Sequence, residues 1–121
     1  MTTVHPALSY ELYPPRSHAS CDSLLKTITE LEQTNPDYVS VTYSGDAQRR
    51  QKTLALLDHL VHETSLNPLA HLICVGHSVA DLERSVRLIL GLGVRGFLAL
   101  RGDIPPENTR PLELPFARYL V

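Results

Sequence analysis

The pattern that most constrains this chain is the regular alternation of strand-like and helix-like segments. Short apolar runs rich in residues that favour strands recur at intervals of about thirty residues, the length of one βα unit. They cover residues 8–13, 38–43, 69–75 and 97–100. Strands that alternate with helices pair in parallel through right-handed crossovers. The sequence therefore predicts an α/β fold with parallel strands and about four βα units.

The segments between the predicted strands carry apolar residues at helical spacing. The three stripes are Leu24, Leu25, Ile28 and Leu31; Leu54, Leu57, Leu60 and Val61; and Leu82, Val86, Ile89 and Leu90. Ser78 and Asp81 have the spacing of a capping box, which predicts the start of the third helix. Gly91 and Gly93 predict its end. A fourth helix is predicted to begin within residues 114–121.

Two architectures fit this order of elements. One is a four-stranded doubly wound sheet, and the other is a partial (β/α)8 TIM barrel. A complete barrel typically needs about 250 residues, so residues 1–121 are expected to form a single partial-barrel domain that does not close alone. The third and fourth predicted strands are nearly all apolar, which is typical of a sheet covered on both faces.

Charge and composition restrict the partners of the chain. The formal net charge of −2 gives no basic surface for nucleic acid or an anionic membrane. The longest apolar stretch, residues 88–94, is far too short to span a bilayer, and the first residues lack a signal-peptide pattern. Cys21 and Cys74 lie far apart without CxxC spacing. We therefore expect a cytoplasmic protein with two reduced thiols.

Polar residues collect near the ends of the predicted strands, where parallel α/β proteins bind their ligands. Glu11 lies within an apolar strand, and buried carboxylates are rare unless they are paired, which favours a function. Thr42 is explained by β propensity alone. His71 lies inside the third strand, where it is either a satisfied core histidine or a ligand.

Residues 101–103, Arg-Gly-Asp, follow the fourth predicted strand. Arg101 and Asp103 fit an ordinary ion pair that flanks a turn. The glycine between them, Gly102, allows a ligand to approach the backbone closely, which favours a binding site.

Two other polar groups lie on the second predicted helix. His59 and His62 lie close to Glu63, but a solvated helix surface explains them better than a metal site, so no metal site is predicted. Residues 49–52 carry three cations, which fit the solvated start of a helix, with a phosphate contact as the alternative.

Four motifs together resemble the successive motifs of the methylenetetrahydrofolate reductase family. They are YELYPPR at 10–16, VSVTY at 39–43, AHLIC at 70–74 and LALRGDIPP at 98–106. Their order and spacing match those of the family, over nearly the whole chain but at most the first half of the family's catalytic barrel. The resemblance implies a flavoenzyme in which NADH or NADPH reduces FAD. The reduced flavin then converts 5,10-methylenetetrahydrofolate to 5-methyltetrahydrofolate.

The resemblance also implies roles for single residues. Glu11 matches a partly buried general acid that promotes opening of the folate's five-membered ring. Asp103 matches an aspartate beside flavin and folate, where it acts in catalysis and in cofactor binding. Thr42 matches a threonine at the nicotinamide and folate face. The matches that line FAD are Tyr43, Gly45, His71, Arg101, Gly102 and Ala117.

Departures from the family pattern keep alternatives open. Asp46 adds a carboxylate after Thr42 and Tyr43, where the family has small residues, and Tyr119 replaces a usual acidic residue. The second half of the barrel is not in this sequence. A longer parent chain, a partner chain or a second copy in a homo-oligomer would complete it and pair the open edge strands. The alternatives to an active reductase are a truncated inactive fragment and a folate- or flavin-binding module.

Overall fold

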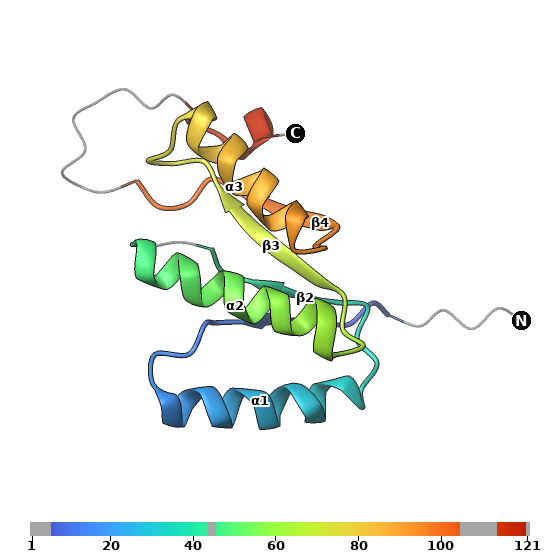
Figure 1. The fold of residues 1–121 in the computed structure, drawn as a ribbon. Coiled ribbons are helices and arrows are strands. Elements are labelled where there is room, and N and C mark those ends of the chain that lie inside the picture. The colour runs from blue at the N-terminus through green and yellow to red at the C-terminus, as the bar shows by residue number, and fades with distance from the viewer. Residues whose placement is uncertain (1–5, 44–45, 105–113, 121) are drawn as a thin grey trace, which may run out of the picture.

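The computed structural model describes residues 6–43, 46–104 and 114–120, and its strands and helices alternate as predicted (Figure 1). The strands are β1 (Ser9–Leu12), β2 (Tyr38–Val41), β3 (Pro68–Ile73) and β4 (Gly96–Leu100). The helices are α1 (His18–Glu32), α2 (Ala47–Glu63) and α3 (Val79–Gly91), and a short 3-10 helix, η1, covers Ala117–Leu120. The α/β class with four parallel strands is confirmed.

The strand order decides between the two predicted architectures. The sheet has the order β1-β2-β3-β4, and all neighbouring strands are parallel. Right-handed crossovers that always step in the same direction place every helix on one face of the sheet. The core agrees, because Ile28 of α1, Leu57 of α2 and Ile89 of α3 join Val39 and Val41 in one buried cluster. A doubly wound sheet has helices on both faces, so the arrangement is that of a partial (β/α)8 barrel.

We call the helix-covered side of the sheet the outer face and the opposite side the inner face. Strand alternation places Val39, Val41 and Ala70 on the outer face, where they are fully buried. The inner-face residues include Glu11, Ser40, Leu69, His71, Ile73, Leu98 and Leu100. Leu98 is 38% exposed, so the prediction that both faces of the fourth strand are covered is wrong for the described part of the chain.

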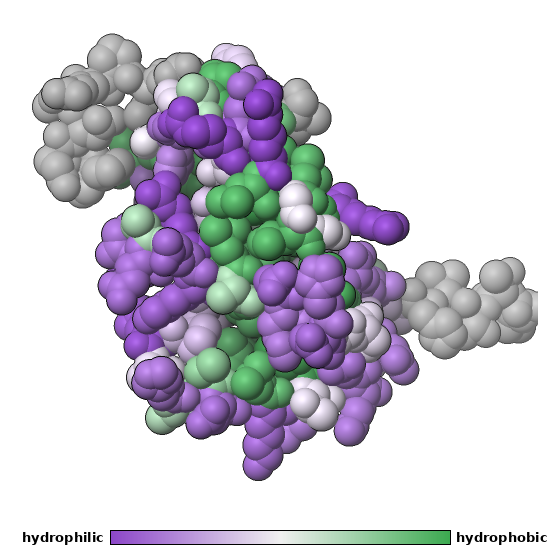
Figure 2. Space-filling view, in the orientation of Figure 1, coloured by the Kyte–Doolittle hydropathy of each residue, from purple (hydrophilic) through white to green (hydrophobic). Residues whose placement is uncertain are grey.

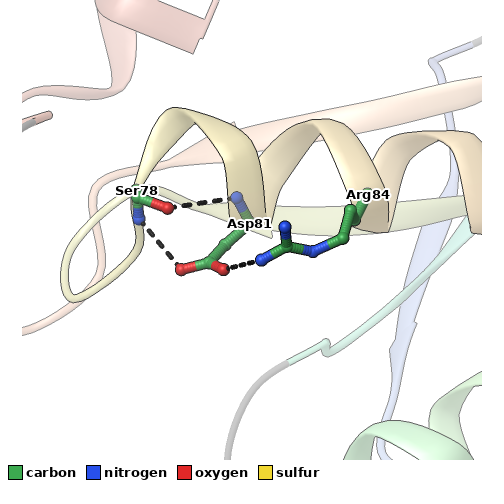
Figure 3. Close-up of polar contacts among 3 residues, drawn as sticks. All are labelled: Ser78, Asp81 and Arg84. Carbon is green, nitrogen blue, oxygen red and sulfur yellow. Dashed lines mark hydrogen bonds and ion pairs between the residues drawn. The ribbon is translucent and has the colours of Figure 1, made fainter.

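The start of α3 follows the predicted capping box (Figure 3). The Ser78 hydroxyl accepts a hydrogen bond from the Asp81 N–H at 3.1 Å, and Asp81 Oδ2 accepts one from the Ser78 N–H at 3.2 Å. The bonds from Ser78 hold the pKa of Asp81 below its usual value, and the ion pair with Arg84 adds to this effect. At the other end, α3 stops at Gly91, and Gly93 takes a positive φ of 100°.

Two predicted element boundaries are wrong. Thr42 and Tyr43 follow β2 instead of ending it, although the Thr42 N–H still donates to the Leu12 carbonyl at 3.3 Å. Within residues 114–120, the predicted fourth helix is only the four-residue η1. Pro115 accounts for the late start, because the residue before a proline is disfavoured in the α conformation.

The surface of α3 carries exposed apolar side chains. Figure 2 shows hydrophobic residues exposed where α3 lies in Figure 1. Leu88 and Leu90 of this helix are 51% and 49% exposed. The apolar surface of α3 therefore extends beyond the face that packs on the sheet.

Both cysteines are unpaired thiols, as predicted. Cys21 is partly exposed and Cys74 is buried. Among the described residues, no helix combines the length and apolar character needed to cross a membrane.

Candidate functional site

Glu11 and His71 face each other on the inner face, although β2 separates their strands. The Nδ1 atom of His71 lies 4.0 Å from Oε1 of Glu11, beyond hydrogen-bond distance. His71 is 3% exposed, and its Nε2 has no hydrogen-bond partner among the described residues. Such orphaned buried atoms are uncommon in native proteins. Within this part of the chain His71 is therefore not a fully hydrogen-bonded histidine, and its role as a ligand-binding residue stays a prediction.

Burial is the main influence on the charge of His71. It lowers the pKa of the imidazole, and the nearby Glu11 carboxylate opposes this effect. The lowered pKa favours a neutral imidazole, in which one ring nitrogen donates and the other accepts.

Glu11 is less buried than the general acid that the sequence predicted. Its side chain is 47% exposed, because it lies on the first strand of the sheet, on the face opposite the three described helices. Its register partner on β2 is Ser40, which is 6% exposed and shares the inner face. Sequence reasoning missed Ser40, although the alternation of residues 39–42 was the available signal.

The Arg-Gly-Asp segment continues β4 along the end of β3. The Arg101 carbonyl accepts hydrogen bonds from the Val75 N–H at 2.9 Å and from the Cys74 thiol at 3.4 Å. Gly102 has φ of 81°, and an added Cβ would lie 2.4 Å from Cγ2 of Ile73. Glycine is therefore required here both by the backbone and by the close approach of β3.

The side chains of Arg101 and Asp103 are both exposed. Between these two described residues no ion pair forms, and Arg101 Nε instead donates to the Gly102 carbonyl at 3.4 Å. An ion pair between Arg101 and Asp103 therefore does not explain this segment, and both side chains are exposed at the carboxyl edge of the sheet.

The remaining predicted residues do not all converge on Glu11 and His71. The Thr42 hydroxyl donates to the Leu12 carbonyl at 3.3 Å, and its carbonyl accepts from the Thr53 hydroxyl at 2.7 Å. Tyr43 packs against the outer-face core. Ala117 lies in η1, which contacts β4. Gly45 lies outside the described residues.

The histidines of α2 do not gather into a metal centre. His62 Nε2 lies 3.4 Å from Oδ1 of Asp58, one helical turn away, and both side chains are more than half exposed. Within residues 6–43, 46–104 and 114–120, no three His, Cys, Asp or Glu side chains lie close enough to hold a metal ion.

Comparison with known proteins places these motifs in a family. The model of the family described as methylenetetrahydrofolate reductase matches residues 1–120. The chain belongs to the methylenetetrahydrofolate reductase family. It is 32% identical over 104 residues to the 5,10-methylenetetrahydrofolate reductase of Escherichia coli strain K12, covering 86% of this chain and 35% of that protein.

Two further relatives show the range of similarity. The 5,10-methylenetetrahydrofolate reductase of Buchnera aphidicola subsp. Schizaphis graminum is 30% identical over 100 residues, covering 83% of this chain and 34% of that protein. Methylenetetrahydrofolate reductase (NADH) 1 of Zea mays is 23% identical over 99 residues, covering 82% and 17%. The chain thus spans about a third of the length of its bacterial relatives.

Proposed function

We propose that residues 1–121 form the first part of the catalytic barrel of a flavin-dependent reductase. The reductase would use NADH or NADPH to reduce 5,10-methylenetetrahydrofolate to 5-methyltetrahydrofolate through FAD. Family membership supports the reaction class. The observation that carries the proposal is the Glu11–His71 pair on the inner face, where His71 Nε2 is buried without a partner.

The residues present fit a flavin at the carboxyl edge of the inner face. His71 has a buried ring nitrogen without a partner among the described residues, and Gly102 leaves the backbone at this edge without a side chain. Arg101 offers an exposed guanidinium at the same edge. We propose that these three residues help to hold FAD, and that Thr42 lies at the nicotinamide and folate face. When bound, FAD would supply the hydride carrier between nicotinamide and folate.

We assign the proton transfer to Glu11. Its carboxyl lies on the inner face, half exposed and therefore accessible to a substrate. As a general acid, the protonated carboxyl would donate its proton to the folate nitrogen that leaves when the five-membered ring opens. Asp103 is exposed at the same edge of the sheet and would orient the folate through its negative charge. His71, 4.0 Å from Glu11, would line the same side of the site.

We propose that activity requires a complete barrel. Three features support this requirement. Leu98 is exposed on the inner face, and Leu88 and Leu90 are exposed on α3. In the described sheet, β1 and β4 are the edge strands. Further βα units, from the same chain, from a partner or from a second copy, would cover these surfaces and close the site to water. The two unpaired thiols support a cytoplasmic location.

The test is Glu11→Gln in the complete barrel. We expect folate reduction to fall by about 10²- to 10⁴-fold, because the general acid is lost, while reduction of the flavin by the nicotinamide continues. Stopped-flow measurement of the two half-reactions separates these effects. Glu30→Gln, an exposed carboxylate on α1, is the matched control and should leave both half-reactions unchanged.

Two outcomes would contradict the proposal. Loss of both half-reactions together in Glu11→Gln would remove its role as the acid. Protein of intact mass that purifies without the absorbance of bound flavin, and does not take up added FAD, would support the inactive fragment instead.

A further inference from the structure

A cavity of about 480 Å³ lies beside the carboxyl ends of β1 and β2. Its walls come from the loop between β1 and α1, from Thr42, and from the first two turns of α2. The polar residues that matter for its chemistry are Tyr13, Arg16, Thr42, Asp46, Arg49 and Lys52. The volume falls within the range typical of small-molecule sites.

Positive charge dominates this cavity. Arg16, Arg49 and Lys52 line it, together with a single carboxylate, that of Asp46. Asp46 is the N-cap of α2, and its Oδ1 accepts a hydrogen bond from the Arg49 N–H at 2.9 Å. Among the described residues, none of the three cations forms an ion pair with a carboxylate. The nearest polar partner of Lys52 is the Arg16 carbonyl, 3.5 Å from Nζ.

The fold brings these cations together from two separate segments. Arg16 follows the Pro14–Pro15 pair after β1, whereas Arg49 and Lys52 lie three residues apart on one side of α2. Like charges that are gathered without counter-ions raise the local potential and favour an anionic ligand. The chain as a whole has a net charge of −2, so this concentration is local.

The donors suit phosphate oxygens. A guanidinium presents a planar fork of N–H groups that matches phosphate, and an ammonium adds a compact point charge. We propose that this cavity binds a phosphate group of a nucleotide through Arg16, Arg49 and Lys52. Thr42 lines the same cavity, which favours the nicotinamide dinucleotide as the source of that phosphate. The choice of this source rests on the proposed function, whereas the phosphate site does not.

Calorimetric titration of the purified full chain with inorganic pyrophosphate tests the site. Saturable one-site binding is expected, and Arg49→Ala or Lys52→Ala should each weaken it roughly tenfold, because one charge-assisted hydrogen bond is lost. Arg50→Ala is the matched control: it removes the same charge one position along α2, and Arg50 is not among the residues that line the cavity. It should change the affinity by less than about twofold. The melting temperature of each variant shows whether it is folded. If a variant in α2 fails to fold, Arg16→Gln, which lies outside α2, takes its place in the test and should weaken binding in the same way.

Two results would overturn the phosphate site. One is binding that does not saturate, and the other is an Arg50→Ala variant as weak as Arg49→Ala, because both indicate unspecific charge attraction. Competition of NADH and ADP with pyrophosphate for the same site supports the nucleotide as the source. Pyrophosphate binding that neither displaces would assign the site to free phosphate. Glu11→Gln should retain pyrophosphate binding, so failure of the proposed reaction and failure of this site are distinguishable.

Discussion

The two faces of the sheet differ in how completely the chain covers them. On the outer face, Val39 and Val41 of β2 and Leu57 of α2 are fully buried in one cluster that joins all three helices. On the inner face, Leu98 is 38% exposed and the Glu11 side chain is 47% exposed. The outer face is thus a finished hydrophobic core, whereas the inner face is unfinished.

The unfinished face also carries the polar chemistry. The outer-face strand positions in the core are aliphatic, whereas the inner face holds Glu11, Ser40 and His71 among apolar neighbours. A polar group inside an otherwise apolar layer is costly unless it has a partner. The outer face therefore stabilises this part of the barrel, whereas the inner face carries the polar groups of the proposed site.

A matched pair of truncations tests this contrast and should give the largest effect. Leu57→Ala on the outer face is expected to lower the free energy of unfolding by about 2–5 kcal/mol, because it leaves a cavity in the core. Leu98→Ala on the inner face should cost less than about 1 kcal/mol, because its side chain is already partly in water. Urea unfolding of both variants measures the difference. Equal losses would show that the inner face is covered in the protein and would break the contrast.

A pair of glycine substitutions tests a tight point at the inner face, the end of β3 beside Gly102. Gly76 and Gly102 have the same φ of 81°, but only Gly102 has a neighbour that a Cβ would strike, Cγ2 of Ile73. Gly76→Ala should cost about 1–2 kcal/mol from backbone strain alone. Gly102→Ala should cost about 2–4 kcal/mol, because overpacking against β3 adds to the strain. Thermal unfolding compares the two variants. Equal losses in the free energy of unfolding would show that Ile73 moves aside without measurable strain.

The pH dependence of stability gives the smallest expected effect. Burial lowers the folded-state pKa of His71, so the unfolded chain binds the proton more readily. The free energy of unfolding should therefore be highest above the pKa of histidine in the unfolded chain, about 6.5, and should fall as the pH drops below that pKa. His71→Gln should flatten this part of the profile relative to the unsubstituted chain. Urea unfolding between pH 5 and pH 8 measures both profiles; an unchanged slope in His71→Gln would contradict the burial argument.

Much of the fold was predictable because its signals are local. The βα alternation, the three apolar stripes and the Ser78 capping box each depend on residues within a few positions of one another. The predicted fourth helix was wrong for an equally local reason, since Pro115 was not weighed as a constraint on Leu114. The candidate site was predicted only in part. Its residues were named, but nothing local indicated that Glu11 lies half exposed or that Ser40 is its inner-face neighbour.

The local sequence and the tertiary structure thus determined different features of this chain. Periodicity and capping chemistry specify strands and helices in the order βαβαβαβ, because they arise from backbone geometry and from neighbouring side chains. The choice of a partial barrel over a doubly wound sheet came only from the strand order, which put all helices on one face. The meeting of Glu11 with His71, and of Arg16 with Arg49 and Lys52, also came from strand pairing and crossovers. In each case the residues that meet lie thirty or more positions apart in the sequence, whereas helix and strand periodicity relates only residues a few positions apart.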